Sequence, residues 1–279
     1  MSGSQLTPVS YIGKTILGII REIEAYTAVT PIYDTASTIN AKRSVVPSLV
    51  PTALPTIGYF GIGIGGSQNV TGQNLSEPTP VLMTNMDLYT PIPFRCVPVA
   101  SDLTPTEQAV YRIRVRQTIN GADYFCYYLK LLTINQATVQ VTQTNTTTGI
   151  QTPYTLEYTN LTPTAPPIVA NGGSPTNTGI EVNVAVTATL PVTGAEVVEA
   201  ITVLYAGNLT YAQISEIGIY SGQDQSVTGL DVNGNAITYT EAVLAQLNLH
   251  YTWQGDSFSD VNTVTNYQIA LGSGSLLLL

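Results

Sequence analysis

Residues 111–134 read YRIRVRQTINGADYFCYYLKLLTI, and this stretch decides the fold class. In its first half arginine alternates with Tyr, Ile and Val, which is the period of an extended strand. The dipeptide Asn120-Gly121 in its middle is a strong signal for a tight turn between antiparallel strands. The stretch therefore predicts a β-hairpin with three arginines on one face, namely Arg112, Arg114 and Arg116.

Other stretches downstream carry the same strand signals. Apolar residues alternate from Ile180 to Leu190, and clusters of Pro, Gly, Asn and Thr at 162–167 and 171–179 have loop composition. Shorter strand-like runs lie at residues 137–144, 152–158, 196–205 and 214–220. We therefore predict a mainly β chain, with an antiparallel β-sandwich of jelly-roll, immunoglobulin-like or mixed type.

The first 80 residues differ from the rest in pattern. Isoleucines recur at three- and four-residue steps within residues 9–26, which predicts a short helix. A chargeless run at 44–76 follows, with prolines at four-residue spacing that would break a membrane-spanning helix. We expect residues 1–80 to form a helix and an extended Pro/Gly-rich arm, whose glycines at 58–66 pack closely against another chain. Residues 81–279 would form the antiparallel β domain, with a sub-boundary near 160–180.

Charge is sparse and unevenly placed along the chain. Charged residues are 10% of the total, and all nine basic residues lie at or before Lys130. Residues 1–130 carry a net charge of +1 and residues 131–279 carry −10, so direct nucleic-acid binding is not expected. The asymmetry is either drift in composition or an acidic face that meets a basic partner or a neighbouring copy.

Counting excludes several kinds of reaction site. His250 is the only histidine, which rules out a pair of ligating histidines and favours a structural role. Cys96 and Cys126 read as buried small hydrophobic residues, and the sequence leaves open whether they pair. Asp231-Val-Asn-Gly-Asn235 lacks the calcium-loop spacing and favours a hairpin turn instead. We expect no enzymatic activity, metal or cofactor, although a glycosidase pair could be drawn from Asp224, Asp231, Glu241, Asp256 and Asp260.

Two features are candidate interface residues. The arginine ladder of Arg112, Arg114 and Arg116 is either a solvated outer face or a contact with carboxylates of another subunit. Because exposed charge pairs add little stability, we expect Arg114→Ala to affect assembly more than folding. The run Leu276, Leu277, Leu278 and Leu279 follows a Gly-Ser spacer and is either a disordered end or an anchor docked in an apolar groove.

Short motifs resemble structural proteins of tailed bacteriophages. Ser215-Glu-Ile-Gly-Ile-Tyr220 is similar to the Glu-Ile-Gly-Leu-Phe signature of tail-fibre and collar-fibre attachment domains. Thr90-Pro-Ile-Pro-Phe94, Tyr111-Arg-Ile-Arg114 and Tyr127-Tyr-Leu-Lys130 resemble stretches of baseplate and neck proteins, and the resemblance covers residues 88–253.

The resemblance implies a virion structural subunit, assembled in the host cytoplasm, in a neck, tail or baseplate. Its partners would be copies of itself in a ring and other virion proteins, with no membrane span and no catalytic residues to carry over. Two alternatives stay open from the sequence. One is a capsid or capsid-decoration protein, and the other is a carbohydrate-binding adhesin or glycosidase module.

Overall fold

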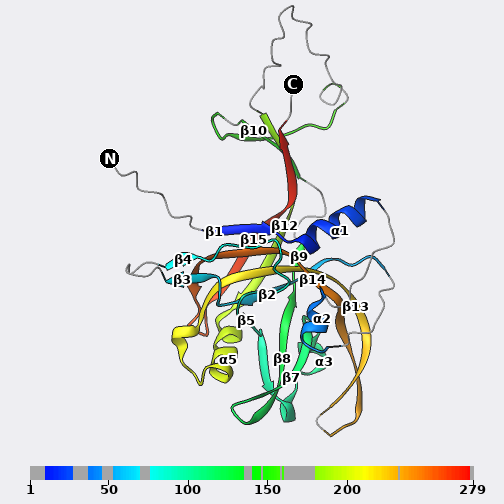
Figure 1. Ribbon diagram of the computed structural model, residues 1–279, viewed down its shortest axis with the longest axis vertical. Helices are drawn as coiled ribbons and strands as arrows, with labels where there is room; N and C mark the ends of the chain where they lie inside the picture. Colours follow the sequence, from blue (N-terminus) through cyan, green and yellow to red (C-terminus); the bar gives the residue numbers. More distant parts are fainter. Residues whose placement is uncertain are drawn as a thin grey trace, which may run out of the picture. The chain divides into compact units, whose positions relative to one another are not determined.

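Strands dominate the structure, which confirms the predicted mainly β fold class with antiparallel sheets (Figure 1). Contacts divide the chain into two compact units, one of residues 1–132 and 191–265 and the other of 133–190 and 266–279. This division has no boundary at residue 80, where we expected one. The computed structural model describes residues 10–27, 37–45, 53–69, 76–134, 140–145, 147–157, 159, 180–231 and 233–276.

The first unit is built on an eight-stranded sheet. Its spatial order is β1-β14-β13-β2-β8-β6, while β5 pairs with β2 and β7 pairs with β8. The strands are β1 (Ser10–Lys14), β2 (Thr56–Gly63), β5 (Pro91–Ile92), β6 (Arg95–Pro98), β7 (Tyr111–Ile119), β8 (Ala122–Leu131), β13 (Gln213–Leu230) and β14 (Ala236–Ser257). A separate two-stranded sheet joins β3 (Ser67–Asn69) to β4 (Ser76–Pro78).

The predicted hairpin is present as β7 and β8. Asn120 and Gly121 both have positive φ angles, 51° and 82°, as a tight hairpin turn of this kind requires. The alternation along β7 is broken at Ile113, whose φ of 57° turns the strand. As a result both faces of its first half are covered, and all residues from Tyr111 to Val115 are buried.

The expected N-terminal arm contributes a strand to the centre of this sheet. β2 lies between β13 and β8, and Phe60 and Ile62 on it are completely buried. The prediction that residues 56–63 belong to an extended arm was therefore wrong, because they form a buried strand of the sheet. Its alternation of Gly with Ile and Phe is the pattern of a strand packed tightly on both sides.

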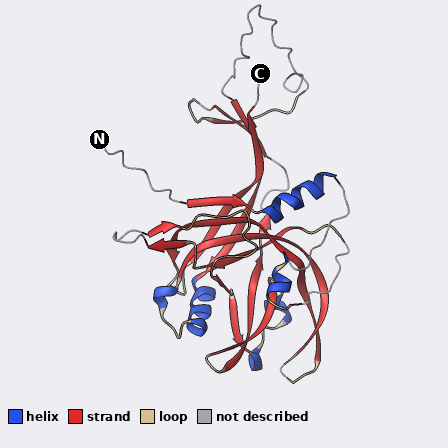
Figure 2. Cartoon of the chain, viewed as in Figure 1, coloured by secondary structure: helices blue, strands red, loops and turns tan. Residues whose placement is uncertain are grey.

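Helices are few and surround the strands of the first unit (Figure 2). α1 (Ile16–Thr27) follows β1 directly, so the predicted helix at 9–26 begins later than expected. Residues 196–205 are not a strand, because most of them form the helix α5. Among the described residues, α5 spans Gly194–Leu204, and other helical segments are α2 (Ile39–Lys42), η2 (Val99–Ser101), α3 (Pro105–Gln108) and η3 (Leu209–Tyr211).

The core of the first unit includes residues from most of these elements. It holds Ile39, Tyr59, Ile113, Leu129 and Tyr220, each at most 4% exposed. Cys96 on β6 and Cys126 on β8 stand directly opposite each other, with Cα atoms 4.2 Å apart, and form a disulfide. The disulfide joins two neighbouring strands of this core.

The second unit has its own five-stranded sheet of order β11-β10-β12-β15, with β9 paired to β12. β12 confirms the strand predicted from the alternation at residues 180–190. The strands are β9 (Thr133–Ile134), β10 (Gln140–Asn145), β11 (Gln151–Pro153), β12 (Ile180–Thr193) and β15 (Val264–Leu276).

Candidate functional site: buried polar clusters around Glu216

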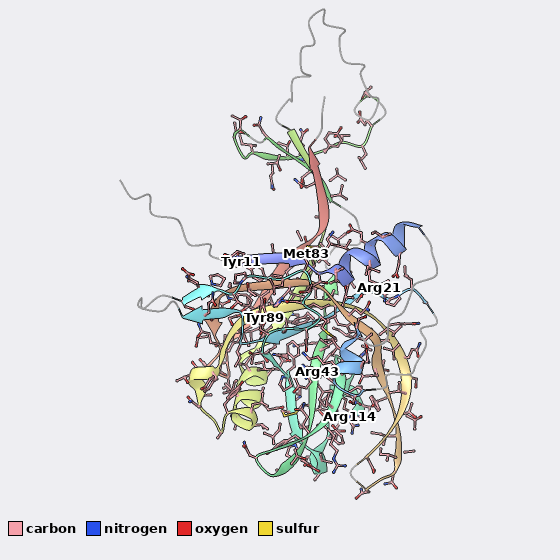
Figure 3. All side chains as sticks on the ribbon, viewed as in Figure 1. Tyr11, Arg21, Arg43, Met83, Tyr89 and Arg114 are labelled. Atoms are coloured by element: carbon pink, nitrogen blue, oxygen red, sulfur yellow. A yellow bond between two sulfur atoms is a disulfide. The ribbon has the colours of Figure 1, made fainter. Side chains whose placement is uncertain are left out.

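The motif that resembles phage attachment domains lies on β13 in the middle of the large sheet. Glu216 within it is fully buried, and its carboxylate accepts four hydrogen bonds. Three come from the backbone N–H groups of Gly65 (3.0 Å), Tyr89 (2.9 Å) and Thr90 (2.8 Å). The fourth comes from Nε2 of His250, 3.0 Å away on β14. One carboxylate thus ties two loops and a neighbouring strand together, with Tyr89 labelled in Figure 3.

His250 extends this cluster on its other side. Its Nδ1 lies 3.0 Å from the amide nitrogen of Asn85, and the ring of Tyr89 stands 5.1 Å from the imidazole ring. Since an ionised carboxylate only accepts hydrogen bonds, Nε2 carries the hydrogen and Nδ1 accepts from Asn85. Both ring nitrogens are therefore occupied, and His250 acts as a connector in this buried cluster.

The glycine-rich run packs against the same cluster. A Cβ at Gly66 would overlap the carbonyl oxygen of Ser215, so the loop passes β13 at backbone contact. The N–H of Gly66 also donates to the hydroxyl of Ser215 at 3.0 Å. We expected the glycines at 58–66 to pack against another chain, and the structure corrects that expectation for two of them: Gly63 and Gly66 pack against β13 of the same chain.

The arginine ladder is paired within the chain. Arg112 makes a two-pronged contact with Asp224 at 2.7 and 2.8 Å, and Arg114 binds Asp102 at 2.7 and 3.0 Å. Arg116 is paired with Asp123 at 2.6 Å.

Burial separates the three arginines. Arg112 and Arg114 are 4% and 8% exposed, and the guanidinium of Arg114 also lies 3.4 Å from the centre of the Phe125 ring. Of the three arginines only Arg116 has a side chain that faces solvent, at 60% exposed, so the ladder is not a solvated outer face at Arg112 and Arg114. A role at an interface stays a prediction for this strand.

Glu241 stabilises the kink in β7. Its buried carboxylate accepts hydrogen bonds from the backbone N–H groups of Ile113, Arg114 and Ala242. Burial raises the pKa of the Glu241 carboxyl above its ordinary value, although the three N–H donors act in the opposite direction. Because Ile113 has a positive φ, its N–H cannot join a regular ladder there, and Glu241 supplies the missing acceptor.

Asp224 connects Arg112 to Tyr59, whose hydroxyl donates to it at 2.7 Å. Partial burial raises the pKa of the Asp224 carboxyl, but the hydrogen bonds from Arg112 and Tyr59 outweigh it, so this pKa lies below its usual value. Burial and the neighbouring carboxylate raise the pKa of the Tyr59 hydroxyl.

Each of the five carboxylates considered for a glycosidase pair accepts hydrogen bonds from other groups of the chain. Asp224 and Glu241 are held as described above. The other three bind side chains or N–H groups within four residues of themselves: Asp231 accepts from the N–H groups of Asn233 and Asn235, Asp256 from the indole N–H of Trp253, and Asp260 from the N–H of Asn262. Each of the five carboxylates therefore has a hydrogen-bond partner within the chain. Within the described ranges, no three His, Cys, Asp or Glu side chains converge as a metal site requires.

A further cluster was missed from the sequence. Glu196 on α5 accepts from Nζ of Lys130 and from the hydroxyl of Tyr111, each at 2.7 Å. The same carboxylate caps the start of α5, because it also binds the N–H and hydroxyl of Thr193. Thr193-x-x-Glu196 is a capping box, and this spacing could have predicted the helix.

The other predicted site residues lie at the end of the described chain. Leu276 is the last residue of β15, and Leu277, Leu278 and Leu279 lie outside the described residues. Their anchoring role stays a prediction.

One surface hollow of about 340 Å³ lies in the first unit. Its lining carries no charge and consists of Ile64, Ser67, Ser76, Thr210, Tyr211 and Gln213. Every helix in the described ranges is too short or too polar to cross a bilayer.

The fold and these clusters define a mainly β protein whose buried charged groups brace one part of the chain against another. The chain belongs to DUF7208, a family of unknown function, whose model matches residues 1–279. No match to the chain was found among curated proteins or among solved structures.

Proposed function

We propose that this chain is a structural subunit of a tailed-bacteriophage particle, in its neck, tail or baseplate, held in place by extensive protein contacts. The observation that carries the proposal is the number of apolar side chains left on the surface. Eighteen large apolar side chains are exposed among the described residues, in a chain with only 10% charged residues. A sparsely charged surface with apolar patches suits permanent contact with neighbours.

The place of the resembling motif also supports the proposal. Glu216, Gly218 and Tyr220 are alternate residues of β13, and the hydroxyl of Tyr220 donates to the buried Asp87 at 3.0 Å. Asp87 in turn pairs with Lys42, at 2.7 Å. A motif that braces loops around a central strand serves a rigid scaffold, which is what a virion component requires.

Native mass spectrometry of the purified chain, followed by electron microscopy of the assemblies, tests this proposal. We expect a ring of six or twelve copies. Icosahedral multiples would instead favour a capsid or capsid-decoration protein. A chain that stays monomeric at high concentration, alone and with the other structural proteins of the particle, would contradict the proposal.

A further inference from the structure

Helix α1 has its apolar face toward solvent. Ile16, Ile20 and Ile23 are 49%, 42% and 55% exposed, while the charged side chains of Arg21 and Glu24 in the same helix are 6% and 7% exposed. This is the reverse of the arrangement typical of a surface helix, in which the apolar stripe faces the core. The isoleucines are therefore not needed to hold α1 on its own chain.

Polar contacts attach α1 to β14 instead. The guanidinium of Arg21 donates to Oε1 of Gln246 from Nε at 2.8 Å and from Nη2 at 2.6 Å, and pairs with Glu24. At the start of the helix, the buried hydroxyl of Thr15 donates to the carbonyl oxygen of Leu247. Gly18 lies so close to β14 that a Cβ there would overlap the backbone of Asn248. The helix is thus fixed in position with its isoleucines outward.

The exposed stripe continues beyond the helix. Ile12 on β1 is 61% exposed, and Leu82 and Met83 in the adjoining loop are 56% and 57% exposed. The loop lies against the start of α1, because the N–H of Ile16 donates to the carbonyl oxygen of Met83 at 2.8 Å (Figure 3). Six large aliphatic side chains are thus exposed on adjoining elements. The largest apolar patch of a typical monomer measures roughly 300–600 Å² and is often functional.

The spacing and charge of this surface match a second copy of itself. Ile16, Ile20 and Ile23 are four and three residues apart, the spacing of a coiled-coil seam. The charges within residues 10–27 are Lys14, Arg21, Glu22 and Glu24, which cancel. Two chains of net charge −9 can therefore approach each other here without local repulsion.

The elements that carry the stripe also bear a pair of opposite charges. Lys14 on β1 and Glu22 on α1 form an ion pair within the chain at 2.6 Å, and their side chains are 41% and 36% exposed. In a two-fold arrangement with antiparallel helices, Lys14 of each copy meets Glu22 of the other. Since an exposed ion pair contributes little, exchanging its partner between copies costs little.

We propose that the stripe of Ile12, Ile16, Ile20, Ile23, Leu82 and Met83 is a contact between two copies of this chain, formed by antiparallel α1 helices. This inference rests on the proposed self-assembly and names the surface that one of its contacts uses.

The first test is a double variant, Ile16→Gln with Ile20→Gln, studied by sedimentation velocity over a range of concentrations. Glutamine keeps the helix and removes the apolar surface. We expect the dissociation constant of the pairwise contact to rise at least tenfold. The matched control is Leu230→Gln with Val261→Gln, which changes two exposed aliphatic residues outside the stripe and should leave association unchanged.

The second test uses charge and does not depend on the isoleucines. Lys14→Glu and Glu22→Lys should each weaken association, because each places like charges opposite one another. An equimolar mixture of the two variants should associate more tightly than either alone.

The outcomes separate this inference from the proposed function. If the wild type assembles and the double glutamine variant assembles equally well, the α1 contact is overturned and self-assembly stands. If the double glutamine variant assembles normally but no longer binds phosphatidylcholine vesicles, the α1 contact is also overturned, and the stripe is a lipid-binding surface instead. A wild type that never self-associates overturns both.

Discussion

Nε2 of His250 lies 3.0 Å from Oε2 of Glu216, and neither side chain is exposed to solvent. The same carboxylate also accepts the N–H groups of Gly65, Tyr89 and Thr90. Four donors around one carboxylate leave it no unpaired oxygen. The fold of loops 64–66 and 85–90 therefore depends on both oxygens of Glu216 acting as acceptors.

Replacing Glu216 with glutamine tests this dependence. Glu216→Gln keeps the size of the side chain but turns one acceptor oxygen into an NH₂ donor that faces N–H groups. Leaving a buried donor unsatisfied costs about 1–3 kcal/mol, so the free energy of unfolding should fall by about that amount in urea denaturation. Glu157→Gln, at an exposed position, is the control and should change it little. Equal stability of the two variants would contradict the bracing role.

Gly66 offers a second test of the same cluster. Gly66→Ala would place its Cβ against the carbonyl oxygen of Ser215, which cannot move without shifting β13. Overpacking of this kind costs about 1–3 kcal/mol, and more where backbone must shift. Gly58→Ala is the matched control, because its nearest neighbour would be 3.9 Å away. In thermal melts the melting temperature should fall clearly for Gly66→Ala and change by a few degrees at most for Gly58→Ala. A similar change for both variants would argue against backbone contact at Gly66.

Local signals could be predicted from the sequence. Asn120-Gly121 specifies its own turn, and Thr104 with Glu107 forms the capping box that starts α3, because both act over four residues or fewer. The mainly β class followed from such signals repeated along the chain.

What could not be predicted depends on distant residues. The carboxylate that pairs with Arg112 is Asp224, 112 residues later, and no local pattern links the two. Similarly, the isoleucine spacing of α1 indicates a helix but not which side is buried. That side is decided by Gln246, which lies 225 residues beyond Arg21. The strand-like composition of residues 196–205 led to a wrong prediction of a strand where α5 lies. The capping box that begins at Thr193 was the better signal.

The structure changes the expected effect of replacing Arg114 on stability. Arg114→Ala was expected to leave stability nearly unchanged, but this guanidinium is buried, paired with Asp102 and stacked on Phe125. Breaking a fully buried pair costs about 3–5 kcal/mol, and Asp102 keeps some access to water, so we expect a loss of about 2–3 kcal/mol. Arg116→Ala is the control and should cost about 0–1 kcal/mol. Urea denaturation measures the free energy of unfolding of both variants. Equal losses would show that the buried ion pair of Arg114 does not contribute more than an exposed one.

The pairing of Asp224 with Arg112 should make stability depend on acid. The pKa of Asp224 is lower in the folded protein than in the unfolded chain, where it is about 3.9. Its contribution to stability is therefore fully present above that value and is lost as the pH falls through the lower folded pKa. Asp224→Asn lacks this contribution at every pH.

We expect the wild type to exceed Asp224→Asn in unfolding free energy most strongly near pH 6–7, with a difference that shrinks steadily below about pH 4. Urea denaturation at several pH values measures this difference. Repeating the comparison in an Arg112→Met background removes the guanidinium that lowers the pKa, so the pH dependence of the difference should become smaller. A difference that is the same at pH 7 and pH 3, or one that is unaffected by Arg112→Met, would show that this ion pair does not set the acid stability of the site.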